Sequence, residues 1–175
     1  EVILGKVTSY ENIMTHNYEY RKLVEKVFDF INVDFVHVHH LMYQYFDIMD
    51  IIQEKKIPYM VTLHDFYFVC PTFVLLENNE KYCVDNEKRD CAKCLKKLKN
   101  LDDNFIEKWR ELSYRVLKNA ELVVTPTESA KEIVQKYFPD VNIKSIEHGV
   151  EKLEYEYQRD GGQAKKNIAF LGGIN

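Results

Sequence analysis

The stretch from Asp34 to Asp65, DFVHVHHLMYQYFDIMDIIQEKKIPYMVTLHD, decides the fold. It opens at residues 35–38 with a short aromatic and β-branched run, which predicts a strand. Apolar residues then recur at spacings of four, three and four, which predicts an amphipathic helix: Leu41, Tyr45, Ile48 and Ile52. Two lysines and Pro58 end that helix, and residues 59–63 form a second apolar run. This order predicts a βαβ unit with parallel strands and a right-handed crossover.

The same alternation continues along the chain. Apolar spacing predicts a helix over residues 105–119, and the sequence Leu-Val-Val-Thr predicts a strand over 122–125. A helix is expected over 129–137, with Ser129 and Glu132 as a capping box. Further strands are expected at 142–146 and 168–171, and a further helix near residues 23–31. The pattern predicts the α/β class, with a Rossmann-like parallel sheet and helices on both of its faces.

Two segments depart from this alternation. Residues 66–100 contain all four cysteines and many charged residues, and we interpret them as an insertion into a Rossmann-like domain that spans residues 1–150. Residues 151–167 are polar and contain two glycines, which is typical of a linker.

Length and charge exclude several functional classes. The 175 residues suffice for one domain with a substantial core. The net charge of −4 argues against a nucleic-acid-binding protein. No apolar run reaches the roughly 18 residues of a membrane span, and residues 1–30 lack a signal-peptide pattern. We therefore expect a soluble, cytoplasmic protein.

Polar side chains follow the first two predicted strands. Ligands of open parallel sheets bind beyond the carboxyl ends of the strands, where His39 and His40 follow one strand and His64 and Asp65 the next. Imidazole titrates near neutral pH and a carboxylate can orient it, so the sequence predicts that His64 and Asp65 carry the chemistry.

Two alternatives compete with that prediction. Some of these histidines, above all His37, which is expected to be buried in its strand, would serve only as hydrogen-bonded structural groups. Strand alternation also puts His37 and His39 on one face, as in metal-dependent hydrolases. That reading needs further ligands after later strands, and only His148 follows one.

The cysteines and one glycine pair are the remaining signals. The spacing of Cys70, Cys83, Cys91 and Cys94 allows a closed tetrahedral zinc site, although it contains a single Cys-x2-Cys pair. Buried thiols and, after them, disulfides are the alternatives. Gly172 and Gly173 follow a predicted strand, as at the start of a phosphate-binding loop.

Five motifs in order are similar to those of the group 1, family 4 retaining glycosyltransferases of the GT-B fold. They cover roughly residues 33 to 175 and read VHVHHL from Val36, VTLHD from Val61 with Cys70-Pro71 after it, VTPTES from Val124, IEHGV from Ile146 and IAFLGG from Ile168. The resemblance implies two Rossmann-like domains that face each other across a cleft. One binds the acceptor and the other the nucleotide-sugar donor.

The resemblance also implies roles for individual residues. His64 matches the family histidine that faces the donor sugar and the acceptor, with Asp65 as its orienting partner. His39 and His40 match the end of the strand next to that of His64, which lines the acceptor cleft. Thr127, Glu128 and Ser129 match the family's strand-to-helix turn, where a helix amino terminus faces the cleft. Residues 168–175 would be the first strand of the donor domain, with Gly172 and Gly173 on its donor-binding side.

The implied reaction transfers a sugar to a carbohydrate or glycolipid hydroxyl with retention of the anomeric configuration. No metal is needed for that chemistry, so zinc would only brace the insertion. The family's opening strand and glycine-rich loop are not recognisable before residue 33, and His148 replaces the commoner asparagine. We expect a fragment of a longer enzyme, inactive alone, whose full-length form could associate peripherally with membranes. A zinc-stabilised interaction module without enzymatic activity and a histidine-metal hydrolase are the alternatives.

Overall fold

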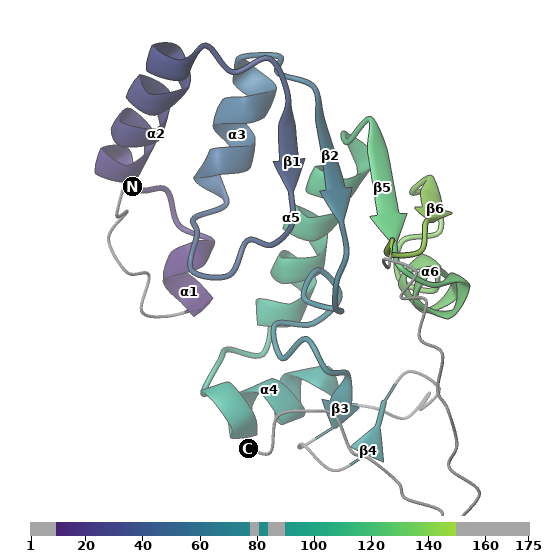
Figure 1. Cartoon of the computed structure of the whole chain (residues 1–175). Coiled ribbons are helices and arrows are strands. Elements are labelled where there is room, and N and C mark those ends of the chain that lie inside the picture. Colours follow the sequence, from purple (N-terminus) through teal and green to yellow (C-terminus); the bar gives the residue numbers. More distant parts are fainter. Residues whose placement is uncertain (1–9, 78–80, 84–89, 150–175) are drawn as a thin grey trace, which may run out of the picture.

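The computed structural model describes residues 10–77, 81–83 and 90–149 of the chain (Figure 1). Its main sheet has the order β1-β2-β5-β6, and every neighbouring pair of strands is parallel. The strands are β1 (Val36–Val38), β2 (Tyr59–Thr62), β5 (Leu122–Thr125) and β6 (Ile143–Ser145). Helices flank the sheet (Figure 1), which confirms the predicted α/β, Rossmann-like class.

The helices and a small hairpin complete the described structure. The helices are α1 (Tyr10–Ile13), α2 (Tyr18–Ile31), α3 (Asp47–Glu54), α4 (Cys91–Lys99), α5 (Phe105–Lys118) and α6 (Glu128–Gln135). The hairpin pairs β3 (Leu76–Glu77) with β4 (Lys81–Tyr82) in antiparallel fashion. It lies beside α4, away from the main sheet (Figure 1). The predicted strand 168–171 and linker 151–167 lie outside the described residues.

Trp109 of α5 is the centre of the core. It is fully buried, and aromatic rings surround it from four segments: Tyr10, Phe46, Tyr67 and Phe105. Its indole N–H donates a hydrogen bond to the carbonyl oxygen of Tyr67 at 2.9 Å. This bond connects α5 to the turn that follows β2.

The cysteine-containing segment shares this core. Tyr67, Val69, Leu75 and Leu95 are all buried in the same apolar cluster as the sheet residue Val61. The segment is thus packed against the domain by apolar side chains, which are the dominant source of stability in a fold of this size.

The helix predicted after β1 begins later than its apolar spacing indicated. Residues 41–46 form a turn, in which the amide of Gln44 donates to the carbonyl of Leu41 and Tyr43 has a φ of 64°. The amide of Phe46 donates instead to the carbonyl of Ile13, 33 positions earlier in the chain. Leu41 and Tyr45, the first two residues of the predicted stripe, lie in this turn, so their spacing resembles a helical stripe without a helix.

The predicted start of the helix after β5, α6, was also wrong. The cap of α6 is Thr127, whose hydroxyl oxygen accepts a hydrogen bond from the amide of Ala130 at 3.1 Å. Ser129 already lies inside the helix, so it does not form the predicted capping box with Glu132.

Candidate functional site

A row of imidazoles lies along the carboxyl edge of the sheet. His39 follows β1, His64 follows β2, and His148 follows β6. Nδ1 of His39 lies 2.9 Å from Nε2 of His64, so one of the two nitrogens donates to the other. The rings of His64 and His148 stack with centroids 5.4 Å apart. All three side chains are exposed, which leaves them available to a ligand.

Asp65 and His40 form a second pair at the same edge. Nε2 of His40 lies 3.2 Å from Oδ2 of Asp65, while Oδ1 accepts a hydrogen bond from the amide of Tyr67 at 2.8 Å. The carboxylate predicted to orient His64 is thus hydrogen-bonded to His40 and to its own turn. The nearest hydrogen-bond partner that the structure gives His64 is His39.

His37 completes the row, although it is not buried as its place in the strand predicted. It is exposed, whereas Val38, which points to the opposite face of the same strand, is buried. Its Nε2 lies 2.8 Å from the hydroxyl of Thr62 on β2, and its ring centroid is 3.9 Å from that of His39. Both histidines therefore share one face of β1, as the alternation of the strand predicted.

The crowding of imidazoles favours their neutral form. The pKa of His64 is lowered mainly by partial burial and then by His39 and His148, and Asp65 opposes this shift. The pKa of His37 is also lowered, first by partial burial and then by His39 and His64. A neutral imidazole keeps one nitrogen with a lone pair, so His64 can accept a hydrogen bond or a proton at neutral pH.

Thr127, Glu128 and Ser129 are exposed where β5 leads into α6. The amide of Leu63 donates to the carbonyl of Val124, so these residues lie at the same edge as His64. The Thr127 hydroxyl caps α6, and the Glu128 carboxylate pairs with Lys131 at 2.6 Å. The side-chain bonds of Thr127 and Glu128 thus stay within the first turn of α6. Gly172 and Gly173 lie outside the described residues.

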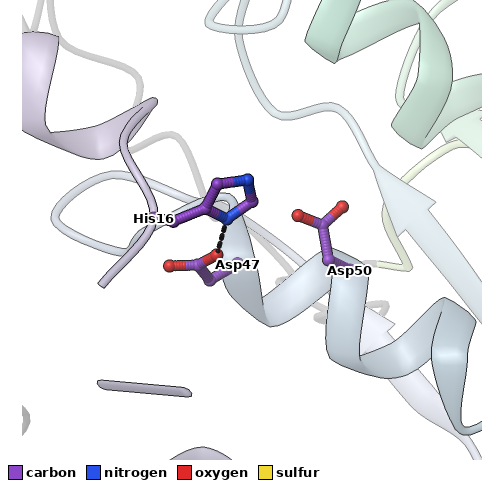
Figure 2. Close-up of side chains that lie close together, drawn as sticks. All are labelled: His16, Asp47 and Asp50. Atoms are coloured by element: carbon purple, nitrogen blue, oxygen red, sulfur yellow. Dashed lines mark hydrogen bonds and ion pairs between the residues drawn. The ribbon is translucent and has the colours of Figure 1, made fainter. Parts of the chain in front are cut away.

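One acidic cluster resembles a metal site by geometry alone. Within the described residues, a single group of three potential ligands has its atoms within 4.8 Å of one another: His16, Asp47 and Asp50 (Figure 2). Both carboxylate oxygens of Asp47 already accept hydrogen bonds, one from His16 and one from the amide of Asn17, each at 2.6 Å. Asp50 pairs with Arg115 at 2.7 Å. These contacts indicate a structural tie between α3 and the loop before α2.

Sequence reasoning missed His148 as a member of the site. The strand-end rule that selected His64 also applies to β6, and His148 lies three residues beyond its end. The rule could not show that the ring of His148 stacks on that of His64. His64 follows β2, which is separated from β6 by β5 in the sheet.

A parallel α/β sheet with titratable side chains gathered at its carboxyl edge defines a ligand-binding, Rossmann-like domain. The model of the family described as Glycosyltransferase Family 4 matches residues 5–152 of the chain. The chain belongs to this family, and its domain is that of a glycosyltransferase. Comparison with curated proteins and with solved structures gives no match. None of the described helices combines the length and apolar character needed to cross a membrane.

Proposed function

We propose that this domain forms the acceptor-side half of an enzyme that transfers a sugar from a nucleotide-sugar donor to an acceptor hydroxyl with retention. The observation that supports it is the position of His64: exposed, at the carboxyl edge of a parallel sheet, with its pKa lowered. An imidazole inside the apolar core, or antiparallel strands, would have argued against a transferase of this type.

In this proposal His64 binds and orients the acceptor hydroxyl. In the reaction, the bond between the anomeric carbon and the diphosphate oxygen breaks, and a bond from that carbon to the acceptor oxygen forms. The acceptor hydroxyl must lose its proton as this happens. A neutral His64 can accept a hydrogen bond from that hydroxyl and hold it on the face of the sugar from which the diphosphate departs, as retention without a covalent intermediate requires. The proton of the hydroxyl passes to the departing diphosphate oxygen, and the positioning lowers the barrier.

Other members of the edge would contribute specificity. His39, His40 and the residues at the start of α6 offer donors and acceptors for sugar hydroxyls on either side of His64. Carbohydrates or glycolipids are the proposed acceptors, which would place the full-length enzyme in the cytoplasm, with peripheral membrane contact if the acceptor is a lipid. The groups that stabilise the departing diphosphate are proposed to belong to a second domain that begins near Gly172 and Gly173, so residues 1–175 alone would be inactive.

The test uses the longest natural chain that carries this domain. Release of nucleoside diphosphate is measured over a panel of nucleotide sugars with a mixed pool of glycan and glycolipid acceptors. His64→Ala should lower kcat by about 10²- to 10⁴-fold, the contribution of a positioned acid–base group. His16→Ala is the matched control, because its side chain is 81% exposed and its hydrogen-bond partner is Asp47 of α3, which is not a member of the histidine row.

Two results would refute the proposal. One is a His64→Ala enzyme as active as the His16→Ala control. The other is efficient turnover by residues 1–175 alone, because that would mean that the groups that bind the diphosphate lie within this chain.

A further inference from the structure

All four cysteines of the chain meet at one small cavity. Cys70, Cys83, Cys91 and Cys94 line it together with Leu75 and Leu95, and its volume is about 20 Å³. Each cysteine is partly buried, and none of the four forms a disulfide. A cavity of this volume admits a single water-sized particle, so it offers room for one ion and for no organic ligand.

Three separate segments bring these cysteines together. Cys70 ends the turn that follows β2, Cys83 directly follows β4, and Cys91 and Cys94 lie in the first turn of α4. The amide of Cys83 donates to the carbonyl of Leu75 at 3.0 Å, which holds the end of the hairpin at the cavity. Cys91 and Cys94 lie three positions apart, so they share one face of the helix.

The surroundings suit thiolates. The guanidinium of Arg110 donates towards Sγ of Cys91 at 3.7 Å, and it is held there by a bond from Nε to the carbonyl of Val69 at 3.1 Å. A zinc ion with four thiolates carries a net charge of −2, which an adjacent arginine partly offsets. Hydrogen bonds of this kind to the ligand atoms are a regular feature of structural metal sites.

The local structure also requires bracing. β3 and β4 have two residues each, and α4 has nine. An isolated two-stranded hairpin is marginally stable at best, and a short helix is marginal without packing. Leu75 and Leu95 anchor the segment to the core, but the hairpin side chains of Lys81 and Tyr82 are exposed.

We propose that Cys70, Cys83, Cys91 and Cys94 bind one structural zinc ion, which cross-links the turn after β2, the hairpin and α4. This metal is independent of the proposed transfer chemistry. In the structure the four cysteines line one cavity, although no three of their sulfur atoms lie within 4.8 Å of one another. Tetrahedral zinc with bonds of about 2.3 Å requires sulfurs about 3.8 Å apart, so zinc binding requires the cysteine side chains to rotate about χ1 into the cavity.

The experiment measures metal content and metal geometry in the full chain. Protein purified without added metal is analysed by elemental mass spectrometry, and we expect about one zinc per chain, as for a closed four-ligand site. Titration of the metal-free protein with Co²⁺ alone should produce the strong visible absorption of a tetrahedral thiolate complex. This second measurement needs no variant, so it holds even where a substitution prevents folding.

Variants identify the ligands. Cys83→Ser and Cys91→Ser should each reduce zinc content at least tenfold after dialysis against a weak chelator. The control is the double variant His39→Ala and His64→Ala, which should retain its zinc, because the imidazoles lie at the other site. Thiol titration should find four slowly reacting thiols that all react quickly after removal of zinc.

Several outcomes would overturn the assignment. One is zinc that is lost from the histidine variant but kept in the cysteine variants. Others are disulfides, shown by the mass of the unreduced protein, and iron in place of zinc. The last is metal-free protein that takes up neither Zn²⁺ nor Co²⁺. None of these outcomes affects the His64→Ala test, which measures diphosphate release, so the two proposals fail separately.

Discussion

Replacement of Asp47 by asparagine tests the structural role given to the acidic cluster of Figure 2. The Asp47 side chain is 1% exposed, and each of its oxygens accepts one hydrogen bond. The donors are His16 and the amide of Asn17, both at 2.6 Å, and the guanidinium of Arg21 lies 3.7 Å away. Asparagine has nearly the same shape, but it keeps one acceptor oxygen and turns an NH₂ group towards the second donor.

The expected loss follows from these contacts. A hydrogen bond to a charged group contributes about 1.5–3 kcal/mol, and the substitution removes one such bond and weakens the other. His16 is 81% exposed and can turn to water, which limits the loss on its side. We therefore expect Asp47→Asn to lower the free energy of unfolding by about 2 kcal/mol. For a chain of this length that lowers Tm by roughly 4–8 °C.

The assay is urea and thermal unfolding followed by circular dichroism at pH 7. Asp50→Asn is the matched control, because Asp50 pairs with Arg115, whose side chain is 46% exposed, and exposed pairs contribute about 0–1 kcal/mol. If Asp47→Asn cost no more than Asp50→Asn, the buried carboxylate would not tie α3 to the preceding loop. Stabilisation of the unaltered protein by Mn²⁺ or Mg²⁺ would likewise refute the structural interpretation and indicate a metal site.

Three further measurements test other parts of the structure. Thr127→Ala should destabilise the domain by about 1 kcal/mol through loss of the α6 cap, whereas Ser129→Ala should be nearly neutral in the same unfolding assay. Tyr59→Phe should cost about 1–2 kcal/mol, because its hydroxyl donates a buried 2.6 Å hydrogen bond to the carbonyl of Val116; an unchanged urea midpoint would contradict this bond. The lowered pKa of His64 means that the folded protein binds fewer protons than the unfolded chain, so stability should fall as pH drops below about 6.5. His64→Gln should make that fall shallower, and an identical pH profile would contradict the environment assigned to this imidazole.

The βαβ unit could be predicted from the sequence because its signals are local. Apolar runs, Pro58 and the spacing of apolar residues are all visible within a short window. The start of α3 could not be predicted in this way. It depends on the hydrogen bond from the amide of Phe46 to the carbonyl of Ile13, a contact between distant segments that no local pattern encodes.

The site was predictable in part for the same reason. The strand-end rule placed His64 and His39 at one edge, and the structure brings them within hydrogen-bond distance. It could not show that His37 lies on an edge strand, or that Asp65 turns to His40, because strand order and turn conformation are properties of the whole fold. The cysteine spacing indicated a shared site, and the packing of three segments around one cavity is the observation that the spacing could not supply.

The turn after β2 connects the two proposed sites mechanically. At its start, Oδ1 of Asp65 accepts a hydrogen bond from the amide of Tyr67. The Tyr67 carbonyl accepts a hydrogen bond from the indole N–H of Trp109. At its end, Arg110 binds the carbonyl of Val69 and donates towards Cys91. Neighbouring residues of α5 thus hold both ends of one short turn, with the row of histidines on one side and the cysteine cavity on the other. A zinc ion in the cavity would therefore brace the end of the turn at Cys70, whereas Asp65 at the other end is held by its own bonds to His40 and to the amide of Tyr67, so the two proposed sites can be tested separately.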